Sequence, residues 1–269
     1  MPIVTLTSDF GRGDYYLPMI KGAILSQDEK LQLVDITHEI DSYDIVRAAF
    51  IFRNAWPSFP KGSIHLISVN DYYQEDCRYL AIQHSGHYFI GPDNGIFTLI
   101  FRDEAIKVFE LPIPQDKAFP LRDIYSTAIG HIVKEQAFEK IGKAVDDPVQ
   151  RITFQPVVQP TAIRGAVIHI DRYDNAILNI DRELFDRIGA GRSFQLFFKR
   201  HDPITTLSRH YHDVPIGEVL CLFNSAGHLE IAINMGKAAE LLGLHVEDTV
   251  QLEFKTVNTI DGERSTVDG

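Results

Sequence analysis

The sequence predicts a two-domain protein, in which an α/β domain is followed by a smaller β-rich domain. Over about the first 150 residues, apolar runs of strand length alternate with segments of helical spacing. A stretch rich in Asp, Pro and Gln, residues 146–160, interrupts this alternation. Beyond it, short strand-like runs are separated by turns, which is typical of a small sandwich or barrel. We therefore expect domains at residues 1–155 and 156–269.

The first strand and the turn after it organise the α/β domain. Residues 3–7 form a β-branched run that predicts a buried strand, and residues 16–23 have helical spacing. Between them, Asp9 and Asp14 lie in a Gly-containing turn. Such a turn lies at the carboxyl edge of an open α/β sheet, where these folds usually bind ligands. Both carboxylates are therefore candidate ligand contacts, and helix capping is the alternative for each.

The remaining elements follow in order along the chain. In the first domain we expect a parallel or mixed sheet with helices on both faces, built from strands at 33–36, 64–69, 80–83 and 88–90 and helices at about 44–54 and 124–139. The turn GPDNG, residues 91–95, has the chemistry of a helix start. In the second domain we expect strands at 166–170, 176–180, 194–198, 219–223, 229–233 and 250–254.

Asp71 and Arg78 are a candidate catalytic pair. Asp71 follows the predicted strand at 64–69, and Arg78 lies in the loop beyond it. An Arg beside a buried Asp would hold that carboxylate ionised, and the pair would be able to orient a water molecule. A structural salt bridge or a solvated acidic loop is the alternative, and spacing alone favours it.

Composition excludes several classes of function. The net charge of −11 at pH 7 and the pI of about 5.4 argue against a nucleic-acid partner or an anionic membrane. Cys77 and Cys221 form no C-x-x-C pair, and the eleven histidines form no H-x-x-x-H or HExxH pattern, so we expect no metal site. No apolar run reaches 18 residues, and we expect a cytoplasmic protein.

Six blocks of the sequence resemble, in order, those of the S-adenosyl-L-methionine (SAM) hydroxide adenosyltransferases, whose superfamily includes the fluorinase and the chlorinase. The blocks are TSDFGRGDYYLPMIKG, VDITHEIDSYDIVRAAF, FPKGSIHLISVND, GPDNGIF, IDRYDNAILNI and FNSAGHLEIAINMGKAAELLGL. The resemblance implies an α/β N-terminal domain followed by a small β-barrel-like C-terminal domain, in a homotrimer whose sites lie at subunit interfaces. It also implies hydrolysis of SAM to adenosine and L-methionine, by attack of water at the ribose C5′, without a cofactor.

The same resemblance assigns roles to residues of the first domain. Asp9 would hold the ribose hydroxyls and Asp14 would lie near the methionine amino group. Asp71 would orient or deprotonate the attacking water, and Arg78 would fix Asp71.

In the second domain, the resemblance implies further substrate contacts. Asn175 and the turn at Asn224 and Ser225 would contact the methionine portion of SAM. The backbone of Asn234 and Met235 would border the adenine.

Two features favour a hydrolase over a halogenase. Similar halogenases carry a long insertion before the turn that matches residues 91–95, whereas here only residues 83–88 lead into it. They also carry a Tyr at the position of Asp71. Both features indicate water, and not halide, as the nucleophile.

Two departures from the family pattern leave alternatives open. The family block FHGRD, whose His completes the water site, reads FPLRD here with Pro120 at the His position, and FGN reads YDN at residues 173–175. The chain is then a hydrolase that uses Asp71 and Arg78 alone or borrows His84 or His87, an enzyme for a related adenosyl compound, or a non-catalytic protein that binds adenosine or SAM.

Overall fold

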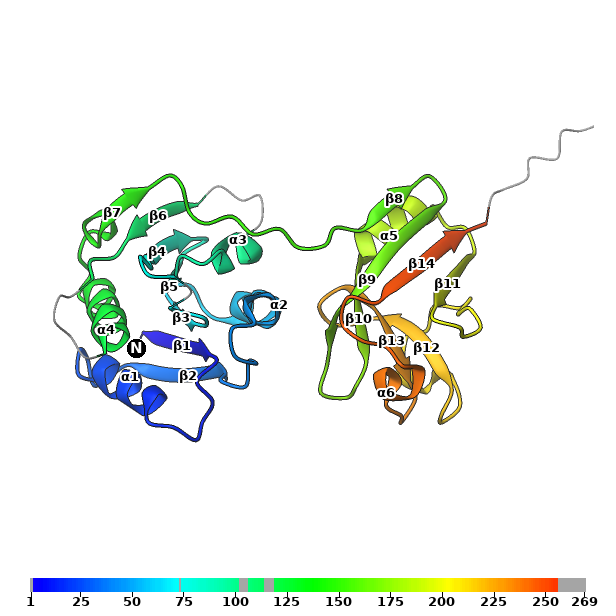
Figure 1. The fold of residues 1–269 in the computed structure, drawn as a ribbon, viewed down its shortest axis with the longest axis horizontal. Coiled ribbons are helices and arrows are strands. Elements are labelled where there is room, and N and C mark those ends of the chain that lie inside the picture. The colour runs from blue at the N-terminus through cyan, green and yellow to red at the C-terminus, as the bar shows by residue number, and fades with distance from the viewer. Residues whose placement is uncertain (1, 73, 102–105, 114–118, 256–269) are drawn as a thin grey trace, which may run out of the picture. The chain divides into compact units, whose positions relative to one another are not determined.

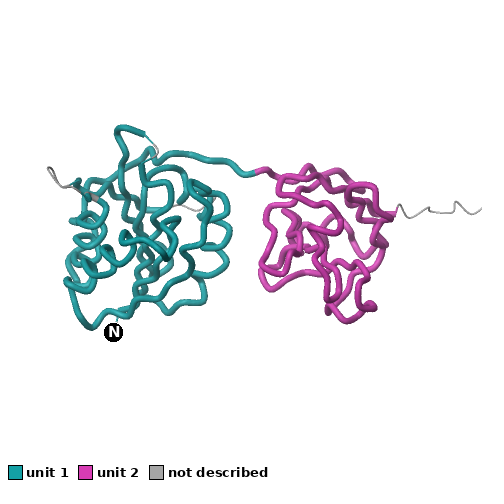
Figure 2. The backbone as a smooth tube through the Cα atoms, turned by 60° about the horizontal axis from the view of Figure 1, so that its bottom comes forward, with its two compact units in different colours: residues 1–153 teal, residues 154–269 magenta. Residues whose placement is uncertain are grey.

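The computed structural model describes residues 2–72, 74–101, 106–113 and 119–255. These residues form two compact units, which divide the chain at residues 1–153 and 154–269 (Figure 2). The division lies two residues before the boundary expected between 155 and 156. Each unit has its own sheet and its own apolar core.

The first unit contains a seven-stranded mixed sheet in the order β2-β1-β3-β5-β4-β6-β7 (Figure 1). The pairs β2–β1, β1–β3 and β3–β5 are parallel, whereas the pairs β5–β4, β4–β6 and β6–β7 are antiparallel. The strands are β1 (Ile3–Ser8), β2 (Gln32–Thr37), β3 (Ile64–Ser68), β4 (Tyr79–His84), β5 (His87–Pro92), β6 (Lys107–Glu110) and β7 (Lys143–Val145).

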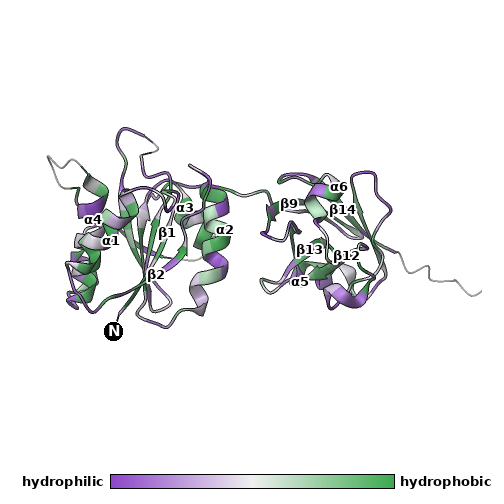
Figure 3. Cartoon of the chain, turned by 90° about the horizontal axis from the view of Figure 1, so that it is seen from below, coloured by the Kyte–Doolittle hydropathy of each residue, from purple (hydrophilic) through white to green (hydrophobic). Residues whose placement is uncertain are grey.

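Helices cover both faces of this sheet, as the strand–helix alternation predicts. Helices α1 (Tyr16–Leu25) and α4 (Pro120–Val133) pack together on one face, and α2 (Ile45–Ala55) and α3 (Ile96–Phe101) pack together on the other (Figure 3). Two short 3-10 helices, Trp56–Ser58 and Phe138–Lys140, complete the unit. The helix expected at 124–139 starts four residues earlier, because Pro is well accommodated in the first turn of a helix.

The second unit is a curled antiparallel sheet in the order β11-β14-β9-β10-β13-β12, with β8 paired to β9. The curl occurs along β9, because residues 162–166 pair with β14 whereas most of residues 167–170 pair with β10. The expected sandwich or barrel is thus a half-barrel. Its strands are β8 (Val157–Gln159), β9 (Ala162–Ile170), β10 (Ala176–Asp181), β11 (Phe194–Phe198), β12 (Val219–Phe223), β13 (His228–Ile233) and β14 (Thr249–Phe254).

Sequence analysis missed two helices of this unit, α5 (Arg182–Gly189) and α6 (Ala238–Leu242). The side chain of Asp181 caps α5 by accepting a hydrogen bond from the Leu184 amide. A 3-10 turn, Tyr211–Asp213, precedes β12. Both α helices contribute buried side chains to the apolar core of this unit, Leu184 and Phe185 from α5 and Ala238, Ala239 and Leu242 from α6.

Candidate active site

Asp9 lies at the carboxyl edge of the first sheet, between the ends of two neighbouring parallel strands. The Asp9 amide reaches the carbonyl of Ser68 at the end of β3 (3.4 Å), and Asp9 Oδ2 accepts from the amides of Tyr43 (3.0 Å) and Asn70 (3.2 Å). Among the described residues both donors meet Oδ2, so Oδ1 keeps its capacity to accept from a ligand hydroxyl. Asp9 therefore joins three loops and caps no helix.

Asp14 is exposed on the same edge. Its carboxylate accepts a hydrogen bond from the adjacent Tyr15 amide (2.6 Å), whereas α1 starts at Tyr16 with no side-chain cap. The capping alternative is therefore wrong for Asp14. The carboxylate remains accessible to a cationic group of a ligand.

Asp71 is a buried carboxylate, with 4% of its surface exposed. Ser68 Oγ donates to Asp71 Oδ2 (2.6 Å), and the hydroxyl of Tyr125 from α4 donates to Oδ1. Burial raises the pKa of Asp71 to about 7, the two hydroxyl donors oppose that rise, and the charge of Asp9 adds to it. A carboxylate with such a pKa is suited to accept a proton near neutral pH.

Asn94 supports the backbone of this loop, a role that sequence analysis did not assign. Its Nδ2 donates to the carbonyls of Val69 (2.9 Å) and Asn70 (3.1 Å), while its Oδ1 accepts from the Ile96 amide at the start of α3. Asn70 has a left-handed backbone conformation, with φ of 52°. The GPDNG turn thus braces the loop that carries Asp71.

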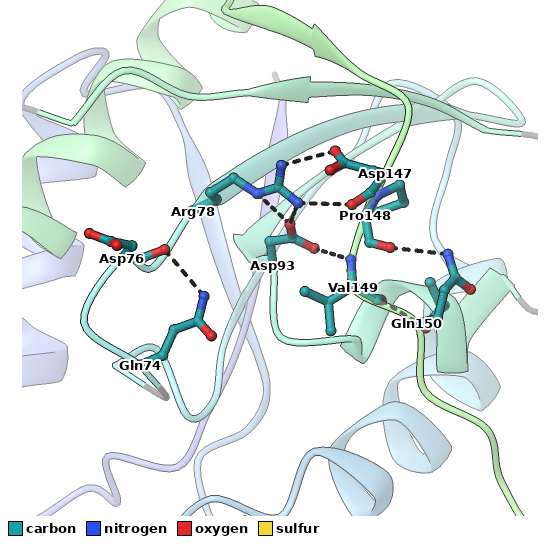
Figure 4. A network of polar contacts seen from close by, with 9 residues as sticks. Gln74, Asp76, Arg78, Asp93, Asp147, Pro148, Val149 and Gln150 are labelled. Carbon is teal, nitrogen blue, oxygen red and sulfur yellow. Dashed lines mark hydrogen bonds and ion pairs between the residues drawn. The ribbon is translucent and has the colours of Figure 1, made fainter.

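The expected pair between Asp71 and Arg78 is wrong. Arg78 Nε donates to Asp93 Oδ2 (2.8 Å), and its guanidinium also binds Asp147 Oδ1 (3.0 Å) and the Asp147 carbonyl (2.9 Å) (Figure 4). Asp93 Oδ1 in turn accepts from the Val149 amide (2.8 Å). Arg78 therefore ties residues 147–149 to the GPDNG turn, and neutral hydroxyls take the positions expected for it around Asp71.

His84 and His87 do not replace the family His. They flank the turn between β4 and β5, where His87 starts β5 and lies at the amino end of the parallel strands. Its ring bonds that of His65 (3.1 Å), whose other nitrogen meets Thr5 Oγ1 (2.8 Å). Asp71 follows the opposite end of β3, roughly 15 Å along the strand direction.

A second group of polar side chains, of which Ser8 and His38 are buried, lies at the ends of β1 and β2. Ser8 Oγ lies 2.7 Å from His38 Nδ1, and His38 Nε2 lies 3.1 Å from Asp35 Oδ1. Burial lowers the pKa of His38, against the opposing effect of Asp35, so the ring is mainly neutral at pH 7. The contact with His38 therefore holds Ser8, the residue before Asp9, against the end of β2.

In the second unit, Asn175 closes the turn between β9 and β10. Its amide group donates to Asp171 Oδ2 (3.1 Å), and its side chain is buried. The neighbouring Asp174 explains one departure from the family pattern, because its Oδ2 accepts from the Glu240 amide (2.7 Å) in α6. Asp174, the additional acidic residue, therefore anchors helix α6.

The other candidate residues of this unit lie at the two ends of β13. Asn224 and the exposed Ser225 form the turn before it, and Asn224 Oδ1 accepts from the amides of Ala226 and His228. Asn234 follows β13 and donates to the Val214 carbonyl (2.7 Å). The register of β10 against β13 places Asn175 nearer to the Asn234 end, so it is separated from the turn with which the resemblance groups it.

Met235, beside Asn234, is an exposed apolar residue with 84% of its surface accessible and a φ of 55°. Because the side chain is exposed, its thioether is available to contact an aromatic ligand. Glu230, in the middle of β13, is buried and accepts from the Tyr211 hydroxyl (2.9 Å), and burial raises its pKa.

No cluster of three or more metal-ligating side chains occurs in the part of the chain that the structure describes. Within the same residues, no helix is both long and apolar enough to cross a membrane.

Two protein-family models match this chain, one in each structural unit. The model of the SAM hydroxide adenosyltransferase N-terminal domain matches residues 4–142, and that of the C-terminal domain matches residues 165–251. The chain belongs to the SAM hydroxide adenosyltransferase family. The two matched segments fall within the two structural units.

Relatives in this family match over almost their whole length. An (R)-S-adenosyl-L-methionine hydrolase of Methanocaldococcus jannaschii is 28% identical, with 94% of this chain and 97% of the relative covered. One of Thermus thermophilus is 30% identical, with 90% and 95% covered. A crystal structure of an uncharacterized conserved protein from Thermotoga maritima has the same fold, with a TM-score of 0.83 at 24% identity over 94% of this chain and 99% of that one.

Within the family framework, the short connection between β4 and β5 is a two-residue hairpin turn. Ser85 and Gly86 occupy it with φ of 51° and 83°, the signature of a type I′ turn, and His84 pairs with His87. A turn of this kind leaves no room for the long insertion of similar halogenases. The structure thus shows the compact form of this region.

Tyr125, like Ser68, is a residue of the site that sequence analysis did not predict. Its position on an apolar helix face is typical of a core aromatic, and its ring does pack edge-on against Tyr79. The available signal was that in this chain FPLRD is followed by Ile124 and Tyr125, which places a phenol hydroxyl on the same helix as Pro120.

Proposed function

We propose that this protein hydrolyses SAM to adenosine and L-methionine. The named relatives of the family support the substrate, since the two described above are both called (R)-S-adenosyl-L-methionine hydrolases and are covered almost completely. The observation that carries the proposal is Asp71, a buried carboxylate with a pKa raised to about 7, on the same sheet edge as Asp9.

The reaction is a displacement at the ribose C5′. A water oxygen forms a bond to C5′ while the C5′–S bond breaks, and the electron pair of that bond leaves with the sulfur as the neutral thioether of methionine. Asp71 takes a proton from the attacking water, which becomes the 5′-hydroxyl of adenosine. Because water is a poor nucleophile, its orientation and deprotonation in a buried site supply the main acceleration.

The remaining carboxylates have separate roles in this proposal. Asp9, with Oδ1 open to a ligand, accepts hydrogen bonds from the ribose hydroxyls. Asp14, exposed on the same edge, pairs with the methionine ammonium. Arg78 has no part in the chemistry and acts on the fold through Asp93 and Asp147.

In the second unit, Asn224 and Ser225 supply polar contacts for the methionine portion. Asn234 and Met235 border the adenine, and Asn175 lies nearer to that end of β13. The reaction balances with SAM and water alone, so we propose no cofactor. We also propose a homotrimer, which the resemblance to the family supports, and we propose that it acts in the cytoplasm.

Product analysis tests this function. Purified protein incubated with SAM should release adenosine and L-methionine in equal amounts, at the same rate with and without chloride. A chlorinated nucleoside formed in chloride would contradict hydrolysis and indicate a halogenase. Absence of product, together with a rise in melting temperature on adding adenosine or SAM, would indicate the non-catalytic binding protein instead.

A further inference from the structure

Pro120 leaves the position of the family His without a group that can carry or donate a proton. The helix that Pro120 starts, α4, nevertheless delivers a polar group to the water site one turn and a half further along. The hydroxyl of Tyr125 points from this helix to Oδ1 of Asp71, and both residues are buried.

The hydrogen bonds around Asp71 divide evenly between its two oxygens. Ser68 at the end of β3 donates to Oδ2, and Tyr125 donates to Oδ1. Among the residues that the structure describes, the groups that face Asp71 are Ser68 from β3, Tyr79 from β4, Tyr125 from α4, Asp9 from the loop after β1 and the adjacent Tyr72. None of these five groups carries a positive charge, so hydroxyl donors are what stabilise the carboxylate.

Tyr125 is suited to remain a donor over the whole working range of pH. Burial, followed by the neighbouring Asp71, holds the pKa of Tyr125 well above its ordinary value. The phenol therefore keeps its proton while Asp71 gains and loses one. A hydrogen bond to the ionised form of a carboxyl lowers its pKa, so the phenol favours the form of Asp71 that accepts a proton from water.

We infer that Tyr125 is the positioning residue of the water site, which holds and ionises Asp71 through the bond to Oδ1 and so fills the role left vacant at Pro120. This inference rests on the proposed hydrolysis for its catalytic meaning. The hydrogen bond itself can be tested without turnover.

The ring of Tyr125 has a structural role as well, which the test must separate from the role of its hydroxyl. Its ring lies 5.9 Å from that of Tyr79, at 82°, in the core beneath the site. Tyr125→Phe keeps this packing and removes only the donor. Tyr79→Phe is the matched control, since its hydroxyl is equally buried but lies near the backbone carbonyl of Asp71 (3.4 Å) and not the carboxylate.

Two titrations of the full-length chain report on Asp71. The first is the pH dependence of kcat for adenosine formation from SAM. The second is an infrared titration of the protonated carboxyl band, assigned to Asp71 by its loss in Asp71→Asn, which needs no substrate. In Tyr125→Phe both midpoints should rise by about one to two pH units, with KM for SAM nearly unchanged, because a donor to a charged group is lost.

Further variants test the direction in which the midpoints move, because a change in packing alone would not reverse that direction with donor strength. Ser68→Ala should move the midpoints upward as well. Tyr125→3-fluorotyrosine, whose phenol is a stronger donor in a ring of nearly the same size, should move them downward. Tyr79→Phe should leave them within about 0.3 pH unit.

Unchanged midpoints in Tyr125→Phe would overturn the inference, as would a shift of the same sign in the fluorotyrosine variant. If Tyr125→Phe did not fold, the fluorotyrosine variant would decide. If the wild-type protein released no adenosine but its infrared midpoint still moved with the variants, the hydrolase proposal would fail and the role of Tyr125 in ionising Asp71 would stand.

Discussion

Asp71 links catalysis to stability at the scale of a single residue. Its pKa is raised from 3.8 in the unfolded chain to about 7 in the fold, so the folded protein binds the extra proton between these values. The stabilisation from protonated Asp71 is therefore present below about pH 4 and is lost as pH rises through 7. Above pH 7 the protein holds a buried charge that costs stability.

Asp71→Asn should remove the base and also that cost. We expect adenosine formation to fall by about 10²-fold to 10⁴-fold. At pH 8 the variant should be more stable than the wild type, by on the order of a few kcal/mol, and at pH 5 the two should approach each other. Steady-state kinetics and thermal unfolding at both pH values measure this, with the exposed Glu29→Gln as control. Full activity in Asp71→Asn would contradict the mechanism.

Arg78 should behave as a structural residue. Arg78→Gln removes the cation from Asp93, whose side chain is 2% exposed, and should destabilise the fold by about 2–3 kcal/mol, because a buried carboxylate loses its charged partner. The matched control, Arg187→Gln, breaks an exposed pair with Glu183 and should cost under about 0.5 kcal/mol. Denaturant unfolding gives both values. A loss of kcat in Arg78→Gln with unchanged stability would restore the catalytic role that spacing suggested.

The residues of the site differ in how far sequence alone could place them. Asp9 and Asp71 follow β-branched runs, and neighbouring parallel strands bring such residues to one edge. Arg78 was paired with Asp71 because Asp71 ends the predicted strand before it, but its partners are Asp93 and Asp147, which lie 15 and 69 residues further along the chain. Pairing over such distances depends on sheet order, which spacing does not contain.

At the scale of elements, the contact between β3 and β5 requires a glycine. A Cβ on Gly91 would lie 2.4 Å from the Ile67 carbonyl oxygen on the neighbouring strand. A Cβ on Gly22, in the middle of α1, would have no neighbouring atom within 4 Å. Gly91 is therefore required by the close approach of two strands, whereas the position of Gly22 has room for a side chain.

Gly91→Ala should destabilise the first unit by about 2–3 kcal/mol, because the strands must separate. Gly22→Ala, its control, should stabilise the protein by about 0.5–1 kcal/mol, since alanine favours the helix. Urea unfolding of both variants checks this. Equal effects of the two substitutions would show that β3 and β5 are not packed as described.

Element prediction succeeded where one periodicity dominates and failed where tertiary contacts decide. The long apolar strands such as β3 and β13 were located within two residues of their ends. Helix α6 was missed because it is only five residues long, and Asp174 helps to hold it from a distant turn. The start of α4 was missed because Pro120 reads as a breaker unless it occupies the first turn of a helix.

At the scale of the whole molecule, the proposed homotrimer has a measurable mass. The chain has a mass of 30.5 kDa, and sedimentation equilibrium at neutral pH should give about three times that value over a range of concentrations. Asp71→Asn should give the same mass, because Asp71 is buried within the first unit. A monomer at micromolar concentration with full activity would contradict the assembly.

The fate of the water oxygen tests the central claim most directly. If water attacks C5′ of SAM, a reaction in H₂¹⁸O should place one ¹⁸O atom in the 5′-hydroxyl of adenosine and none in methionine, as mass spectrometry of both products will show. Adenosine without the label, or label in the amino-acid product, would mean that the C5′–S bond is not broken by water at the Asp71 site.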